Sequence, residues 1–460
     1  MREARAGESG DDTASGTVTG ELVNAVSSAL GQLDEARVRS LVRDLRAPDL
    51  ADLIELLPAG ERAPLIQAIG PEFDYEAFSE LDETVRDQLS EELPNAFLAK
   101  AIVELDSDDA AYVLESLETS DKDEVLAQLS ESDRSALMRN FEYPEETAGR
   151  LMQADYVAVA PFWTVGRVID YMRDADDLPD TFSEIFVVDP SFRVLGSLDL
   201  SRLLRTKREV AVAAIMDTER HMVLATDDQE QVAREFERYD LMSAPVVDVN
   251  NRLVGVVTVD DVVEVIQSEA DEDVRLLGGV GDESVIDGVI YTAKNRVVWL
   301  LINLATAVLA SLVIKQFDAS IEQMVALAVL MPIVASMGGN AGTQTMTIAV
   351  RALATRDLGP VNAGRVVMRE VAVGLINGLL FAVIMAAVAI FWFGSGPLGL
   401  VIAAAMIVNL LAAGLAGILI PLALDRWGYD PAVASGVFLT TVTDVVGFFA
   451  FLGLATVFLI

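Results

Sequence analysis

The most unusual chemical group in the sequence is a carboxylate inside an apolar run. Residues 433–460 are long and apolar enough to cross a bilayer, yet they carry Asp444 near their middle. A charged side chain there costs roughly 2.5–3.5 kcal/mol on insertion scales, so such an acid normally faces a polar interior or a water-filled path. It could be a structural acid that is hydrogen-bonded to a neighbouring helix. Thr441 and Thr440 would share its helical face, and no basic residue stands at matching depth, so a cation path is the better interpretation.

A second apolar segment carries neutral polar groups. Residues 332–358 read PIVASMGGNAGTQTMTIAVRALATRDL and include Asn340 and Gln344 at membrane depth. Their amide oxygens, together with one carboxylate, suit a hydrated hard cation better than a soft metal. The glycines of this segment would let helices approach closely or let the helix loosen, and small-residue packing alone is the alternative for them. These glycines are Gly338, Gly339 and Gly342.

The elements that must position these groups are five apolar stretches, each of spanning length. They cover residues 297–314, 324–350, 366–393, 398–424 and 432–460. With five spans, seven of the eight basic residues after position 290 fall on one side, and only Lys315 falls on the other. Because basic loops stay inside, we expect a multi-pass cell-membrane protein with its N-terminus in the cytoplasm and its C-terminus outside.

Charge divides the chain into two halves. Residues 1–290 hold 64 acidic and 25 basic side chains, whereas the remainder holds seven and eight. A surface this acidic repels nucleic acid, so no nucleic-acid partner is expected. Only five of the 33 basic residues are Lys, which suggests a protein that works in high salt, and acidity alone therefore does not indicate metal binding. The absence of Cys excludes disulfides and thiolate metal sites.

Two segments of the acidic half repeat at a spacing of 59 residues. VVDPSFRVLGSLDLSRLL begins at Val187 and VVDVNNRLVGVVTVDDVV begins at Val246, and each follows a helical pattern. Both predict strand, turn, strand and helix, so the two β-α-β-β-α units resemble a CBS-domain pair. That resemblance implies an adenine-nucleotide pattern, Gly-x-x-Thr-x-x-Asp, which Gly255, Thr258 and Asp261 fit. The first unit departs from the pattern, so at most one ATP site, in the second unit, is predicted.

An earlier pair of segments repeats with an offset of 60 residues. The stretch from Asp49 aligns with the stretch from Asp109, and apolar residues recur at i, i+3, i+4 and i+7 in both. This period predicts short stacked helices that form a small solenoid. The fold class is therefore multidomain, with α, α/β and membrane α parts. We expect a disordered tail at 1–18, a helical solenoid at 19–147, a CBS pair at 148–265, an acidic connecting helix at 266–293 and five transmembrane helices at 294–460.

In this order, the parts resemble the MgtE family of magnesium channels. The most specific matches are GGNAGTQT in the second span, YDPAVASG before the fifth, and TTVTDVVGF within it. The resemblance implies that Asp444 recognises hydrated magnesium at the axis of a homodimer. The polar residues at membrane depth, Asn340, Gln344 and Thr441, are predicted to line the same path. Magnesium keeps several waters and usually meets only one or two carboxylates, which agrees with this assignment.

The family also senses cytosolic magnesium through acids where solenoid, CBS pair and connecting helix meet. Asp108 takes the solenoid position, whereas Tyr112 stands where the pattern has a second acid four residues later. The other implied sensor residues are Asp228, Glu230, Asp240, Asp261, Glu264, Glu269, Glu272, Asp273 and Asp430. The resemblance implies that bound magnesium bridges these carboxylates and closes the pore, and that repulsion opens it when magnesium falls.

Two other function classes compete with a magnesium channel. One is a transporter of another divalent cation, such as cobalt or manganese, although the lack of Cys and of any intramembrane His disfavours softer metals. The other is a non-conducting sensor of nucleotide or magnesium, against which the polar groups at membrane depth argue. An enzyme is not expected, because no nucleophile–base pair stands out and the single His, His221, fits a surface or packing role better. The expected partners are Mg²⁺, membrane lipid and a second copy of the chain.

Overall fold

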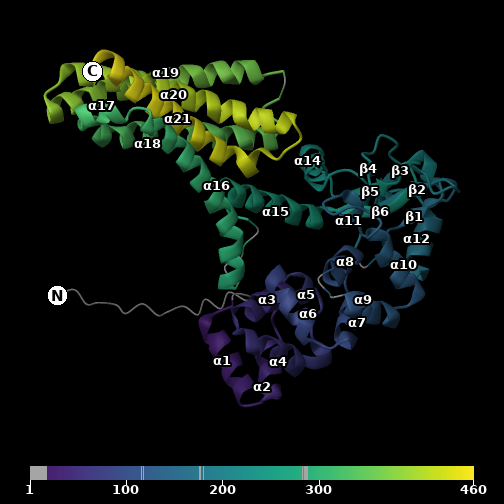
Figure 1. The fold of residues 1–460 in the computed structure, drawn as a ribbon. Coiled ribbons are helices and arrows are strands. Elements are labelled where there is room, and N and C mark those ends of the chain that lie inside the picture. Colours follow the sequence, from purple (N-terminus) through teal and green to yellow (C-terminus); the bar gives the residue numbers. More distant parts are fainter. Residues whose placement is uncertain are drawn as a thin grey trace, which may run out of the picture. The chain divides into compact units, whose positions relative to one another are not determined.

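The chain divides into two compact units, residues 1–266 and 267–460 (Figure 1). The computed structural model describes residues 18–460, apart from positions 116, 118, 176, 177, 180, 282, 284–287 and 360. The predicted disordered tail therefore lies outside the described residues except for Val18, which packs against the core of the helical domain.

The first unit begins with short stacked helices, as the sequence predicts. They are α1 (Gly20–Gly31), α2 (Glu35–Val42), α3 (Ala47–Leu56), α4 (Ala59–Ile69), η1 (Gly70–Glu72), α5 (Glu76–Ser79), α6 (Glu83–Glu92), α7 (Asn95–Glu104), α8 (Ser107–Glu115), α9 (Thr119–Gln128) and α10 (Glu131–Asn140). Helices this short are marginal alone, so their stability comes from packing. The aligned positions Leu53 and Val113 on α3 and α8 are both fully buried, which explains the 60-residue repeat.

Two three-stranded sheets follow and confirm the CBS pair. The elements are α11 (Ala148–Leu151), β1 (Ala158–Val159), α12 (Val165–Asp174), β2 (Glu184–Val188), β3 (Val194–Asp199), α13 (Leu200–Arg205), η2 (Val212–Ala214), β4 (Val223–Leu224), α14 (Gln229–Tyr239), β5 (Ser243–Val247), β6 (Leu253–Thr258) and α15 (Val259–Leu277). In each sheet the first strand pairs parallel with the second, which pairs antiparallel with the third. Gly196 lies opposite Val187 and Gly255 lies opposite Val246, so the two units share one register.

The structure explains why an Asp and a Gly recur at matching positions of the two CBS units. Asp189 accepts hydrogen bonds from the backbone N–H groups of Ser191 and Arg193, and Asp248 closes the second hairpin turn in the same way. A Cβ on Gly196 would lie 2.2 Å from the carbonyl oxygen of Asp217, and a Cβ on Gly255 would lie 2.6 Å from the sulfur of Met152. The repeated Asp forms a turn, and the repeated Gly admits a neighbouring segment.

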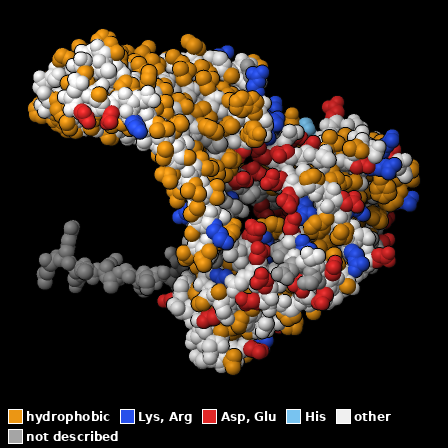
Figure 2. Space-filling view, in the orientation of Figure 1, with side chains coloured by type: hydrophobic (Ala, Val, Ile, Leu, Met, Phe, Trp, Pro, Cys, Tyr) orange, Lys and Arg blue, Asp and Glu red, His pale blue; other side chains and the backbone are white. Residues whose placement is uncertain are grey.

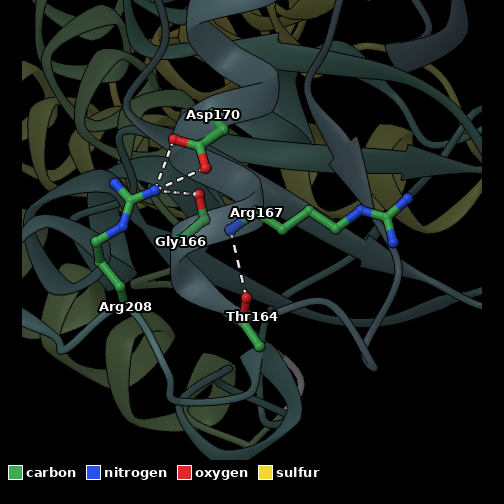
Figure 3. A network of polar contacts seen from close by, with 5 residues as sticks. All are labelled: Thr164, Gly166, Arg167, Asp170 and Arg208. Atoms are coloured by element: carbon green, nitrogen blue, oxygen red, sulfur yellow. Dashed lines mark hydrogen bonds and ion pairs between the residues drawn. The ribbon is translucent and has the colours of Figure 1, made fainter.

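A polar network holds the start of α12 in the first CBS unit (Figure 3). Thr164 Oγ1 accepts from the N–H of Arg167 at 3.3 Å and caps the helix. Arg208 donates to the carbonyl oxygen of Gly166 at 3.2 Å and to the Asp170 carboxylate at 2.6 Å. Because the ion pair is exposed, its contribution to stability is modest, and it mainly fixes the segment around Arg208 against α12.

The second unit contains five helices that are long and apolar enough to span a membrane, among the described residues, so the five-span prediction is confirmed. They are α16 (Val289–Lys315), α18 (Ala326–Ala354), α19 (Ala363–Phe393), α20 (Gly396–Arg426) and α21 (Pro431–Phe458), with the short α17 (Asp318–Gln323) after the first. Hydrophobic side chains cover the visible face of these helices (Figure 2). Helix α20 packs against α18, α19 and α21 and forms the centre of the bundle.

The connecting helix is shorter than predicted. The expectation of one helix over 266–293 is wrong beyond Leu277, because α15 begins at Val259, within the residues assigned to the CBS pair, and ends at Leu277. Gly278 and Gly279 follow, and Gly279 has φ of +68°, a conformation that stops a helix at little cost only for glycine. The chain becomes helical again at the start of α16.

Candidate ion path and cation-binding acids

Asp444 lies in the middle of α21 as a half-buried carboxylate. It is thirteen residues beyond the helix start, about 20 Å along the axis. Its side chain makes no hydrogen bond or ion pair to any of the residues that the structure describes. The hydroxyl of Thr441 donates to the carbonyl oxygen of Val437 at 2.7 Å, so its proton is used within the helix and only its oxygen lone pairs remain available. An acid without an internal partner is free to meet a cation.

Helix α18 carries its polar groups and its glycines on different faces. Asn340 and Gln344 are exposed one turn apart, whereas Gly338 and Gly342 are buried. A Cβ on Gly338 would lie 2.2 Å from the amide of Asn409, and one on Gly342 would lie 2.7 Å from Leu439. The helix is continuous, so these two glycines serve close packing rather than unwinding. Gly339 has no atom within 4 Å of its missing side chain.

Asn409 is a polar residue of the membrane half that the sequence analysis did not single out. It is fully buried on α20, and its Nδ2 donates to the carbonyl oxygen of Val334 on α18 at 2.7 Å. Its Oδ1 finds no hydrogen-bond partner among the described residues, and its amide also lies against Gly447 of α21. Asn409 therefore joins the two helices that bear Asn340 and Asp444. The available signal was an amide inside the apolar run 398–424.

Glu370 is a second carboxylate in the membrane half that was missed. It lies on α19 and is only 5% exposed. Its Oε2 accepts from the hydroxyl of Thr345 on α18 at 3.1 Å, and its Oε1 lies 3.5 Å from Nε of Arg369. It lines a cavity of about 130 Å³ together with Gln344, Asn377 and residues of α20. The signal was again present, because Glu370 is an acid inside the predicted third span.

In the first unit, the structure brings Asp108 and Asp261 together from the helical domain and the second CBS unit. The hydroxyl of Ser107, at the start of α8, accepts from the backbone N–H of Ala154 at 2.7 Å. The buried Asn140, the last residue of α10, donates to the carbonyl oxygens of Met152 at 3.0 Å and of Ser107 at 3.5 Å. These bonds fix the first turn of α8 against the segment that enters the CBS pair. Oδ1 of Asp108 is buried without a hydrogen-bond partner among the described residues.

Burial and mutual repulsion raise the pKa values of this group. Burial, and then the negative charges of Asp261 and Asp109, raise the pKa of Asp108 well above its ordinary value. Burial, together with the charges of Glu264 and Asp261, raises the pKa of Asp109 to about 7. Burial raises the pKa of Asp261 to about 6, although the hydroxyl of Thr258 lowers it. The raised pKa values mean that these acids take up protons more readily than free carboxylates, and a bound cation would favour their ionised form.

Asp109 and Glu264 complete this group. Burial and the nearby charge of Glu80 also raise the pKa of Glu264, which lies one turn beyond Asp261 on α15. Glu264 was predicted, whereas Asp109 was not, although it stands next to Asp108 in the sequence. We call Asp108, Asp109, Asp261 and Glu264 the α8–α15 acid group. Acidic side chains are visible on this unit in Figure 2.

Several predicted sensor residues have local structural roles. Asp228 caps α14 by accepting from the N–H of Gln231 at 3.1 Å, and Glu230 pairs with Arg234 at 2.6 Å. Asp240 ends α14 with φ of +50°. Glu269, Glu272 and Asp273 lie on the second half of α15, and Asp430 caps α21. Among the described residues, no three acidic or His side chains are arranged so that they could hold a metal ion directly.

Tyr112 and His221 are both in aromatic contacts. The guanidinium of the buried Arg86 lies 3.5 Å from the centre of the Tyr112 ring, so a cation–π contact occupies the position where the family pattern has an acid. His221 stacks on Tyr239 with ring centroids 3.8 Å apart, which agrees with the packing role expected for it.

The predicted nucleotide pattern forms part of the α8–α15 junction. Thr258 Oγ1 donates to the Asp261 carboxylate at 2.6 Å, and the amide of Gln153 donates to the same group at 3.2 Å. Gly255 is covered by Met152 and Gln153. The three residues thus have internal partners, and Asp261 belongs to the acid group as well as to the pattern.

A membrane domain with buried and half-buried carboxylates, joined to a CBS pair and a helical domain, defines a multi-pass membrane protein with an acidic N-terminal half. Residues 331–454 match the family described as MgtE, divalent cation transporter, residues 25–146 match the MgtE intracellular N domain, and residues 148–209 and 212–268 match the CBS domain.

Curated relatives match along nearly the whole chain. The magnesium transporter MgtE of Bacillus subtilis is 32% identical over 422 residues, which cover 92% of this chain and 94% of the relative. The magnesium transporter MgtE of Thermus thermophilus is 32% identical over 454 residues, covering 95% and 99%. A crystal structure of the cytosolic domain of the Mg²⁺ channel MgtE in complex with ATP is 31% identical, with a TM-score of 0.49, and covers 53% of this chain and 99% of that one. The chain belongs to the MgtE family.

Proposed function

We propose that this chain is a magnesium channel that admits Mg²⁺ across the cell membrane and closes when cytosolic Mg²⁺ binds its acidic part. The observation that carries the proposal is Asp444, an acid at mid-span with no partner among the described residues, in a chain whose relatives are magnesium transporters. A carboxylate in that place is costly unless water or a cation reaches it.

The chemistry of the membrane half favours a hydrated hard cation. Asp444 supplies one charge, and Asn340, Gln344 and Thr441 supply neutral oxygens from two helices. At 4 Å and an effective dielectric constant of about 20, one charge pair contributes about 4 kcal/mol, so a dication would keep the acid ionised. Contact through retained waters is the usual way in which proteins hold magnesium. A second copy of the chain would bring a second Asp444 to the same ion.

Uptake of Mg²⁺ into proteoliposomes tests this function. Asp444→Asn keeps the size and removes the charge, and we expect it to reduce uptake to background. Asp425→Asn, at the exposed end of α20, is the matched control and should leave uptake unchanged. Uptake by Asp444→Asn at the level of the unchanged protein would refute the pore assignment. Competition with cobalt and manganese then distinguishes a magnesium channel from a transporter of another divalent cation.

For the regulatory part, the α8–α15 acid group supports magnesium binding. Oδ1 of Asp108 is a buried acceptor without a partner among the described residues, and the donor set contains only oxygen, which suits Mg²⁺. A hydrated ion would need only the Asp108 and Asp261 carboxylates as direct or water-mediated contacts. The ion would replace the protons that burial and repulsion now favour, so its binding releases protons.

Helix α15 supplies a route from this acid group to the ion path. Asp261 and Glu264 lie near its start, while Leu276 and Leu277 at its end pack against a buried cluster that includes Met346 of α18 and Leu439 of α21. These two helices carry the proposed pore residues. A magnesium ion that fixes the start of α15 would therefore bias the packing at its end, which is the proposed closing mechanism. The remaining predicted sensor acids would strengthen closure through further bridged pairs.

ATP is a second proposed ligand, at Gly255, Thr258 and Asp261. Because Thr258 and Gln153 already bond to Asp261, a nucleotide there would have to replace these bonds. Isothermal titration of the full chain with ATP, with and without Mg²⁺, tests the site. Thr258→Val should weaken binding, and binding unchanged by that substitution would remove the site from consideration.

A further inference from the structure

Glu370 is the most strongly buried carboxylate of the described membrane helices, and it lines a cavity. The role proposed for Asp444, Asn340, Gln344 and Thr441 does not explain why an acid is buried there. Charged groups within spanning helices are costly and mark ion or proton paths more often than they serve packing. Glu370 is 5% exposed, and one neutral hydroxyl, that of Thr345, is its short-range partner. Nε of Arg369 is 3.5 Å away, beyond a normal hydrogen bond, and the Arg369 side chain is 63% exposed.

The cavity supplies the ligands that a hydrated cation needs. It measures about 130 Å³, enough for several waters, and the side-chain oxygens of Glu370, Gln344 and Asn377 come from residues that line it. The Thr345 hydroxyl, which is also in the wall, is occupied by its hydrogen bond to Glu370. The side chains of Gln344 and Asn377 make no hydrogen bond to other residues that the structure describes. One carboxylate with several neutral oxygens around a water-sized space suits a hard cation that keeps part of its hydration shell.

The polar groups of the membrane half lie at different depths along the spanning helices. The end of α18 and the starts of α19 and α21 lie on one side, because successive spans alternate in direction. At 1.5 Å per residue, Asp444 and Asn340 lie about 20 Å from that side, Gln344 about 15 Å, and Glu370 about 10 Å. Gln344 shares a helix face with Asn340 and lines the Glu370 cavity, so it connects the two levels.

From these observations we propose that Glu370 is a second cation-binding carboxylate of the ion path, about 10 Å closer than Asp444 to the side that carries the basic loops. The proposal rests on the proposed function, since it extends the same path. Arg369 is the counter-ion that remains beside Glu370 when no metal is bound, and its exposed side chain leaves when a dication enters. Two sites in series also suit conduction, which requires that an ion bind and still move on.

A thiol protection assay tests binding at this cavity directly, because the natural chain has no cysteine. Gln344→Cys places a single thiol in the cavity wall, and a positively charged methanethiosulfonate reagent reports its accessibility. In the full chain reconstituted in liposomes, we expect Mg²⁺ to slow modification by about tenfold or more. Glu370→Gln in the same background should abolish protection, because it removes the charge that attracts the ion.

Three further variants separate the possible causes. In the Gln344→Cys background, Arg369→Gln should lower the Mg²⁺ concentration needed for protection by about tenfold, since a competing charge is removed. Thr345→Val removes the hydrogen bond to Glu370 and should leave protection by Mg²⁺ in place. If Glu370 served only to hold the helices together through that bond, Thr345→Val would instead abolish protection, as Glu370→Gln does. Asp444→Asn should also leave protection in place.

The outcomes also distinguish this proposal from the proposed function. If Mg²⁺ protects the thiol equally with and without Glu370→Gln, the second site is refuted, and loss of uptake in Asp444→Asn would still support the first. If the reagent does not reach the thiol at all, no water-filled path passes Gln344, and the second site is again refuted. If uptake survives in both Asp444→Asn and Glu370→Gln, the pore assignment and the second site fail together.

Discussion

The pH dependence of the α8–α15 acid group is the sharpest prediction for the regulatory part. When α8 opens locally, its two carboxylates leave this group and regain ordinary pKa values. The folded pKa of Asp109 is about 7 against 3.8 for the free side chain, so deprotonation of the closed form costs about 4 kcal/mol of local stability. The stability is present in acid and is lost as pH rises toward 7, because the closed form binds the extra proton. Asp261, at about 6, shares the same repulsion, so its cost does not simply add.

Hydrogen exchange of α8 peptides in the full chain measures this local stability. With a chelator present, we expect protection of α8, corrected for the intrinsic rate, to fall at least tenfold between about pH 5.5 and about pH 8. Mg²⁺ at a hundred times its dissociation constant should restore about 2.7 kcal/mol of the local stability of α8 near pH 8. It should restore much less near pH 5.5, where protons already neutralise the acids.

One substitution tests the cause of this pH dependence, and a second serves as its control. Asp109→Asn should flatten the pH dependence, since it removes the charge that repels Glu264 and Asp261. Glu131→Gln on α10, an exposed acid of the same helical domain, should leave it unchanged. Equal protection of α8 at the two pH values in chelator would refute the reasoning, because the acids would then be neither buried nor mutually repelled.

The remaining predictions concern packing in the membrane half. Gly338→Ala should destabilise the bundle by about 1–3 kcal/mol in thermal unfolding in detergent, because the new Cβ would lie 2.2 Å from Asn409. The control, Gly339→Ala, meets no atom within 4 Å and should be neutral. Equal effects of the two substitutions would contradict the packing role of Gly338. Leu277→Ala should raise the Mg²⁺ concentration that closes the channel in flux measurements, since it weakens the contact of α15 with the ion-path helices, while Val274→Ala, on an exposed position of the same helix, should not. An unchanged threshold in Leu277→Ala would count against α15 as the coupling element.

Much of the architecture follows from local sequence patterns. The five spans are apolar runs of sufficient length, and the CBS pair is a repeat whose Asp and Gly positions each have a local cause. Asp444 stands out in the sequence because a charge in such a run is costly wherever the helix packs. The connecting helix was less predictable, since the acidic pattern continues past Leu277 and only the conformation of Gly279 ends it.

Sequence alone therefore determined the order of domains, the number of spans and the presence of one acid at mid-membrane, because these depend on hydrophobicity and period along the chain. Tertiary structure decided which acids meet. Asp109 gains its altered pKa only because folding buries it and brings it near Glu264 and Asp261, and Glu370 gains its cavity only because α18, α19 and α20 meet around it. Electrostatic free energy depends on distance and burial, and neither quantity can be obtained from spacing along a chain.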